Sequence, residues 1–209
     1  MSENTTHLLS VKDLHTSFTT DHGEVQAVNG VSFNLDAGKV LGIVGESGSG
    51  KTTIGRSIIR LYNPTDGRIT FNGKVISGAL DRNTRSMLRS DMQMIFQDPI
   101  ASINPRMTVR EIIAEGLKIR GIKDEKYIDE KVYEVLDLVG LVREHADRYP
   151  HEFSGGMRQR VVIAIAMACN PRILICDEPT TALDVTIQAQ ILDLLKKLQA
   201  KYGLTVIYI

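Results

Sequence analysis

The sequence predicts an α/β fold with a mostly parallel β-sheet, on two observations. Apolar runs typical of strands covered on both faces recur along the chain, namely "VLGIVG" (40–45), "RILICDEP" (172–179) and "LTVIYI" (204–209). Segments with helical periodicity alternate with them, namely "TTIGRSIIRLY" (52–62), "MRQRVVIAIAMACN" (157–170) and "TTALDVTIQAQILDLLKKLQAKYG" (180–203). Alternation of buried strands and helices is typical of a parallel sheet.

The first part of the chain predicts antiparallel strands instead. Residues 8–36 alternate apolar and polar side chains between turn-forming stretches. A second hairpin is expected in "GRITFNGKVI" (67–76), with its turn at Asn72 and Gly73. We therefore expect an antiparallel β subdomain over 8–76, interleaved with a glycine-rich loop.

The middle of the chain predicts a helical insert. Between about 107 and 141, apolar residues fall on one helical face with charges opposite, and we interpret this face as core packing. The face comprises Ile128, Val132, Val135, Leu136 and Val139. The helical subdomain is expected over about 100–160, within a single domain covering 1–209.

Composition limits the classes of protein that fit. The 209 residues are 43% hydrophobic, enough for a sizeable core, and 25 basic residues balance 25 acidic ones. This balance gives no indication of nucleic-acid binding, and none is expected. The N-terminus lacks the pattern of a secretion signal, and no apolar run is long enough to span a membrane. The only cysteines, Cys169 and Cys176, lie in apolar stretches and predict buried packing residues in a reducing compartment.

A glycine-rich loop, "GESGSGKTT", predicts a phosphate site. It follows an expected strand and opens an expected helix, the context in which backbone N–H groups and a helix N-terminus face phosphates. Lys51 is expected to reach the β- and γ-phosphates, and the Thr52 hydroxyl to bind Mg²⁺. A glycine turn with an incidental lysine is the alternative. The predicted nucleotide-binding residues here are Gly45, Glu46, Ser47, Gly48, Ser49, Gly50, Lys51, Thr52 and Thr53.

Two carboxylates follow the second buried strand. Asp177 comes at its carboxyl end, where α/β sheets present ligand groups, and Glu178 comes next. We expect Asp177 to hold the magnesium shell and Glu178 to orient or deprotonate the attacking water. A strand that ends in two solvated acids is the alternative.

A second anion site is predicted at "FSGGMRQR" (153–160). Ser154, Gly155 and Gly156 open a helix, so a hydroxyl, free N–H groups and the positive end of the helix dipole coincide there. An ordinary helix N-cap is the alternative reading of these three residues. The chain thus carries two phosphate-binding features about a hundred residues apart.

With "GESGSGKT", "SGGMRQR", "ICDEP" and "TALD", the whole chain resembles the ATP-binding-cassette (ABC) ATPases. The resemblance implies a P-loop NTPase fold, ATP and Mg²⁺ as ligands, and pairing with a second ABC ATPase subunit, head to tail. In that arrangement "SGGMRQR", which resembles the family's signature motif, caps the γ-phosphate held by the other subunit. One chain would then carry two half-sites.

The resemblance extends to further residues. Gln97, in "FQDP", resembles a catalytic glutamine that reaches the magnesium and senses the membrane partner, and Asp184 resembles an aspartate at the dimer seam. Phe18 corresponds to an aromatic that stacks on adenine. Because "TTDHGEVQ" is expected to lengthen the following turn, a buried core Phe18 is the alternative.

"FQDPIASINPRM" and "DEPTTALDVTIQAQI" resemble the subfamily that powers import of di- or oligopeptides, or nickel, in bacteria and archaea. The implied partners are two integral membrane permeases and, through them, an extracytoplasmic solute-binding protein. The implied location is the cytoplasmic face of the membrane, as a peripheral subunit. A groove formed by the helical insert and the Gln97 loop would receive a short permease helix. Cargo, and pairing with itself or a different ATPase, stay open.

Three other functions are weighed against import. They are a soluble ABC ATPase outside transport, a non-catalytic module that dimerises on nucleotide, and an exporter. The family also places a histidine just after the strand that ends at Ile209, and we expect the chain to be part of a longer protein that contains it. The chain's own histidines are not expected to replace it; they are His7, His15, His22, His145 and His151.

Overall fold

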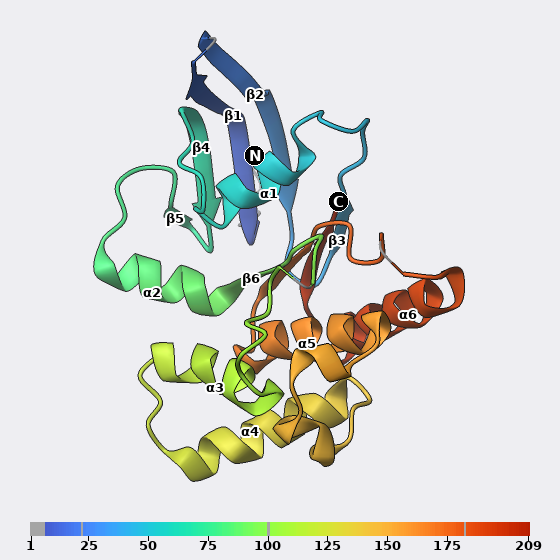
Figure 1. Ribbon diagram of the computed structural model, residues 1–209. Helices are drawn as coiled ribbons and strands as arrows, with labels where there is room; N and C mark the ends of the chain where they lie inside the picture. Colours follow the sequence, from blue (N-terminus) through green and yellow to red (C-terminus); the bar gives the residue numbers. More distant parts are fainter. Residues whose placement is uncertain (1–6, 22, 100, 182) are drawn as a thin grey trace.

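The computed structural model describes residues 7–21, 23–99, 101–181 and 183–209. They form two four-stranded sheets with helices packed around them (Figure 1). The antiparallel sheet and α1 occupy the upper part of Figure 1, and α3, α4 and α5 occupy the lower part. The expected α/β class with a parallel sheet is confirmed.

The antiparallel sheet has the strand order β2-β1-β4-β5. Asn72 and Gly73 both have positive φ, 48° and 77°, the twist that suits a two-residue hairpin, as predicted. Thr20 pairs directly with Gly23, so the expected lengthening of the turn after Phe18 is wrong: β1 and β2 stay paired to their ends. The strands are β1 (Leu9–Thr20), β2 (Gly23–Leu35), β4 (Asp66–Phe71) and β5 (Lys74–Val75).

The parallel sheet has the order β3-β8-β7-β6. β7 is buried along its whole length, as predicted. The expectation that "VLGIVG" is buried on both faces is wrong, because β3 covers only three residues, and Val40 and Val44 are exposed. Among the described residues β3 pairs with β8 alone, so its other edge has no strand partner. The strands are β3 (Val40–Gly42), β6 (Met92–Ile95), β7 (Ile173–Cys176) and β8 (Thr205–Tyr208).

The helices follow the predicted pattern except for α2, which the sequence analysis did not assign. Only Thr84 and Leu88 are buried in α2, so it has no apolar stripe to reveal it. Asp81, which caps its N-terminus by accepting a bond from the Thr84 N–H, was the available signal. The α-helices are α1 (Lys51–Ile58), α2 (Arg82–Asp91), α3 (Val109–Ile119), α4 (Glu125–Leu138), α5 (Gly155–Ala168) and α6 (Val185–Tyr202), with 3₁₀ turns at Arg143–Asp147 and Pro150–Glu152.

The parallel sheet lies between two apolar clusters. One joins α3, α4, α5 and α6 to one face of the sheet, and it contains the whole predicted stripe from Ile128 to Val139. The other joins the antiparallel sheet and α1 to the opposite face. Cys169 and Cys176 are both buried, as predicted. The division into subdomains over 8–76 and about 100–160 stays a prediction.

Two glycines of the antiparallel sheet offer a test of its packing. Gly67 (φ +91°) and Gly73 (φ +77°) share a left-handed backbone, but a Cβ would lie 2.1 Å from the Asp13 carbonyl oxygen at Gly67 and meet nothing at Gly73. We expect Gly73→Ala to cost about 1 kcal/mol and Gly67→Ala about 2 to 5 kcal/mol of unfolding free energy. Urea denaturation measures both, and equal losses would contradict the close approach of β1 to Gly67.

Candidate nucleotide site

The glycine loop runs from the end of β3 to the start of α1. Gly48 and Gly50 have φ of 78° and 87°, conformations that favour glycine. A Cβ on Gly50 would also lie 2.1 Å from the Ala27 carbonyl oxygen, so only glycine fits where the loop passes β2. The loop from Gly45 to Ser49 is exposed, which leaves its N–H groups accessible to an anion.

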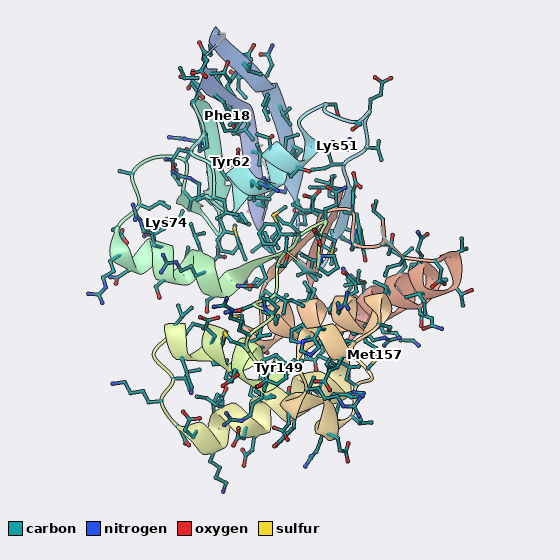
Figure 2. All side chains as sticks on the ribbon, viewed as in Figure 1. Phe18, Lys51, Tyr62, Lys74, Tyr149 and Met157 are labelled. Carbon is teal, nitrogen blue, oxygen red and sulfur yellow. The ribbon has the colours of Figure 1, made fainter. Side chains whose placement is uncertain are left out.

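Lys51 places its charge at the loop. Its ammonium donates to the carbonyl oxygens of Gly45, at 2.8 Å, and Glu46, at 2.5 Å. In Figure 2 Lys51 lies at the start of α1, beside this loop. A positive charge, glycine-loop N–H groups and a helix N-terminus therefore converge on one point.

Thr52 and Asp177, 125 positions apart in sequence, meet behind the loop. The Thr52 hydroxyl donates to Asp177 Oδ1 at 2.9 Å. Asp177 is only 1% exposed, and its Oδ2 has no hydrogen-bond partner among the described residues. Burial raises the pKa of this carboxyl, and the Thr52 hydrogen bond and the charges of Arg56 and Lys51 oppose the rise.

These two groups suit Mg²⁺. A hydroxyl and a buried carboxylate oxygen without a partner are hard oxygen donors of the kind Mg²⁺ binds together with phosphates. No cluster of three or more His, Cys, Asp or Glu that could hold a metal occurs among the residues described. Thr52 and Asp177 alone supply two oxygen donors to a cation at this place.

Gln97 and Glu178 are brought together by neighbouring strands. Gln97 follows β6 and Glu178 follows β7, and these strands pair in parallel with Ile95 opposite Cys176. The Gln97 side-chain amide donates to Glu178 Oε2 at 2.8 Å. Glu178 has a left-handed backbone, φ 43°, and its N–H donates to the Ile209 carbonyl oxygen. A non-glycine residue in this conformation is strained, and such strain often accompanies function.

Thr181 is a member of this group that the sequence analysis did not single out. Its hydroxyl donates to Glu178 Oε2, also at 2.8 Å. Nothing in the pattern "DEPTT" separates this threonine from Thr180, because only the turn after β7 decides which hydroxyl faces the carboxylate.

Ser154, Gly155 and Gly156 form the start of α5, with Ser154 as its N-cap. The Ser154 hydroxyl accepts a bond from the Met157 N–H at 3.3 Å. A Cβ on Gly156 would lie 2.6 Å from Ile187 of α6, so this glycine lets the two helices approach. Asp184 caps α6 by accepting from the Ile187 N–H at 3.0 Å. Ser154 therefore caps α5, Ser154 and Gly155 are exposed, and the anion site at this helix start stays a prediction.

The structure does not bring this second anion site to the glycine loop. Among the described residues, no hydrogen bond or ion pair joins Ser154–Gly156 to the loop. Figure 1 places α1 in the upper half of the molecule and α5 in the lower half. The glycine loop and the start of α5 are therefore apart in the structure, and their roles as two half-sites stay a prediction.

Phe18 packs against protein. Its ring is half-buried and meets Tyr62 edge to face, with centroids 5.0 Å apart, and Figure 2 shows the two side chains together. This packing agrees with the alternative of a structural Phe18, and its stacking on adenine stays a prediction.

None of the histidines in the described ranges bonds to the group formed by Lys51, Thr52, Asp177 and Glu178. His145 accepts a hydrogen bond from the Val142 N–H, as expected of a capping group, and His7 pairs with Asp36. His22 lies outside the described residues, as do Ile100 and Ala182 of the motifs quoted above.

The glycine loop, the Thr52–Asp177 pair and Glu178, on a parallel sheet beside a helical insert, define a P-loop nucleotide-binding ATPase. The ABC transporter family matches residues 28–181, and the chain belongs to this family. The expected resemblance to ABC ATPases is thereby confirmed.

The chain is similar in sequence to several transport ATP-binding proteins. The chain is 54% identical to the oligopeptide transport ATP-binding protein OppF of Bacillus subtilis, over 98% of the chain and 68% of that protein. It is 52% identical to OppF of Streptococcus mutans, over 100% and 68%. It is 50% identical to the dipeptide transport ATP-binding protein DppD of B. subtilis, over 97% and 62%. The chain thus spans roughly two thirds of the length of these relatives.

Solved structures agree on the fold. A dimeric ATP-binding cassette, MJ0796, in a post-hydrolysis state with ADP and Pi has a TM-score of 0.85 at 30% identity, over 96% of this chain and 86% of that one. CbiO1 of Clostridium perfringens, part of the ABC transporter complex cbiONQ, gives 0.82 at 30% identity, over 97% and 77%. Among the described residues, none of the helices has the length and apolar character needed to cross a bilayer.

The buried Asp177 carboxylate makes stability depend on pH. A raised folded-state pKa means that the folded state holds this proton more tightly than the unfolded state. The stability that Asp177 contributes by holding this proton is therefore fully present below pH 3.8, the ordinary pKa of the group. It is lost as pH rises through the pKa of Asp177 in the folded state. Asp177→Asn removes the buried charge, so we expect the nucleotide-free protein to melt about 2 to 4 °C higher at pH 7.

Thermal unfolding between pH 4 and 8 measures this effect. The gain from Asp177→Asn should shrink as pH falls, while Asp21→Asn, at an exposed turn, should change little at any pH. A lower melting temperature for Asp177→Asn at pH 7 would show that its carboxylate stabilises the fold instead.

Proposed function

We propose that this chain is the ATP-hydrolysing subunit of a transporter that moves di- or oligopeptides across a membrane. The observation that carries the proposal is the Glu178 carboxylate held by Gln97 beside the Thr52–Asp177 pair and the glycine loop. The choice of peptides over nickel rests on the names of the OppF and DppD relatives. Peripheral attachment at the cytoplasmic face of the membrane follows from the same proposal.

ATP binds with its β- and γ-phosphates at the N–H groups of the glycine loop and the Lys51 ammonium. Thr52 and Asp177 are the residues that would hold Mg²⁺, and Gln97 is proposed to join them by turning from Glu178, to which it now donates. Mg²⁺ held there would neutralise negative charge on the phosphate oxygens.

Glu178 acts on the attacking water. Its carboxylate takes a proton from water as the water oxygen bonds to the γ-phosphorus and the bond from that phosphorus to the bridging oxygen breaks. ADP leaves with the electron pair of the broken bond. Burial of the neighbouring Asp177 and the fixed backbone of Glu178 position these groups before ATP arrives.

A second subunit completes the site. Ser154 and Gly155 lie at an exposed helix start, separate from the loop of the same chain, and a head-to-tail partner would bring its own copies to the γ-phosphate. Asp184, which caps α6 beside this helix start, would lie at the seam. The dimeric state of MJ0796 supports this arrangement. Because ATP contacts both subunits only in the closed dimer, its binding favours closure.

The membrane subunits are proposed to dock at a basic hollow between α1, α2 and β6. A hollow of about 810 Å³ is lined by Arg60, Arg85 and Arg89, with Leu88 and Phe96 among its apolar residues. An adjoining hollow of about 590 Å³ shares Arg85 and Arg89 and adds Arg82 and Arg120. Among the described residues no acidic side chain lines either hollow, although the net charge of the full chain is zero.

Charge complementarity favours a short acidic and apolar segment of a permease as the occupant. Burial and the charge of Arg85 lower the pKa of Arg60, so an acidic partner would relieve repulsion between neighbouring cations. Phe96 lines the hollow and precedes Gln97, which contacts Glu178. A segment docked on Phe96 would thus lie one residue along the chain from Gln97, whose side chain holds the Glu178 carboxylate. A solute-binding protein would act through the permeases.

Glu178→Gln tests the catalytic proposal. We expect ATP turnover by the native protein to fall about 100- to 10,000-fold, because the amide cannot accept the water proton, while ATP still binds. Phosphate release and nucleotide-binding titrations measure the two effects. Glu130→Gln, on an exposed face of α4, is the control. Turnover by Glu178→Gln at the parent rate would refute the assigned chemistry.

Charge reversal tests the docking surface. In Arg85→Glu with Arg89→Glu, we expect the membrane subunits that co-purify with the protein to fall about tenfold, because the basic hollow would repel an acidic segment. Lys196→Glu with Lys201→Glu is a matched control on α6, which Figure 1 places on the opposite side from α2. ATP binding should not change in either. Equal recovery of membrane subunits with both variants would exclude this surface, and recovery of none with the parent protein would favour a soluble ATPase.

A further inference from the structure

Two hydrogen-bond donors converge on a single oxygen of the Glu178 carboxylate. Gln97 Nε2 and Thr181 Oγ1 each lie 2.8 Å from Oε2. No residue in the described ranges bonds to Oε1. Hydrogen bonds to an ionised group are short and strong, so Oε2 is anchored and Oε1 is left to face a ligand.

The two donors differ in how firmly they are tied to Glu178. Gln97 belongs to the segment that follows β6, and its neighbour Phe96 lines the basic hollow. A partner bound in the hollow could therefore shift Gln97 and change its hydrogen bond to Glu178. Thr181 lies three residues after Glu178 in the same turn, and its N–H donates to the Glu178 carbonyl oxygen at 3.3 Å. Thr181 therefore moves with Glu178, whereas Gln97 need not.

The backbone of Glu178 is already fixed, because its N–H donates to Ile209 and its φ is 43°. What stays free is rotation of the side chain, whose ordering has an entropic cost. The Thr181 hydroxyl restricts this rotation, and because Thr181 lies in the same turn as Glu178, no long loop has to be ordered to bring it there.

We propose that Thr181 is a positioning residue for ATP hydrolysis, holding Glu178 by Oε2 so that Oε1 accepts the proton of the attacking water. The inference rests on the proposed role of Glu178. In this arrangement Thr181 keeps the carboxylate in place whenever Gln97 turns from Glu178 toward the metal site.

Thr181→Val and Thr181→Ser test the proposal in the native protein. Valine keeps the shape and removes the hydroxyl, and serine restores the hydroxyl. We expect Thr181→Val to lower kcat about tenfold, with nucleotide affinity and melting temperature unchanged, and Thr181→Ser to stay within about twofold of the parent. Thr181 is exposed, so neither change should disturb packing. Thr70→Val, in β4 of the other sheet, is the control.

A double-mutant cycle separates positioning from a structural effect. In single-turnover experiments on a Glu178→Gln background, Thr181→Val should cost less than about twofold, because its effect passes through the carboxylate. Equal losses in the valine and serine variants, an unchanged kcat for Thr181→Val, or the same tenfold loss on both backgrounds would each overturn the proposal. Retained turnover by Glu178→Gln alone would instead overturn the proposed function.

Discussion

The burial of the Asp177 carboxylate at the end of β7 is the constraint on which the rest of the site depends. A carboxylate taken out of water needs compensating partners, and only Oδ1 has one, the Thr52 hydroxyl. This bond ties the start of α1 to the centre of the parallel sheet. Since α1 begins where the glycine loop ends, the same bond also fixes the position of the loop relative to the parallel sheet. The unpartnered Oδ2 of Asp177, where a cation is proposed to bind, is thus held in place by the same packing that folds the chain.

Steric constraints position the remaining groups. Gly50 lets the loop pass against β2, and Gly156 lets α5 begin against α6. Both glycines lie at the start of a helix, where backbone N–H groups lack helical partners. Each anion-binding feature is therefore held by close packing behind it, and its polar groups stay free in front. The two proposed half-sites of the chain can therefore form without touching each other.

Much of this could be predicted from the sequence because it depends on local patterns. The glycine loop, the β7 strand with its two acids and the α5 start each follow from neighbouring residues, and all three occur where expected. α2 escaped prediction because its contacts with the core are few and its surface is almost wholly polar. β3 was predicted with too much burial because an apolar run does not reveal how many neighbours a strand has. The contact of Thr181 with Glu178 was not predicted because it depends on the geometry of the turn after β7. The dipeptide "TT" does not reveal which of the two hydroxyls faces the carboxylate.

The strand order of the parallel sheet has a consequence for biosynthesis. β3 is made early, yet among the described strands its only neighbour is β8, about 165 residues later. At translation rates of about 5 to 20 residues per second, β3 waits about 10 to 30 s for its partner to be synthesised. The antiparallel sheet involves only the first 75 residues and can pair meanwhile. A nascent chain therefore presents a formed β-sheet joined to an unpaired apolar strand for much of its synthesis, the kind of surface that chaperones at the ribosome would meet.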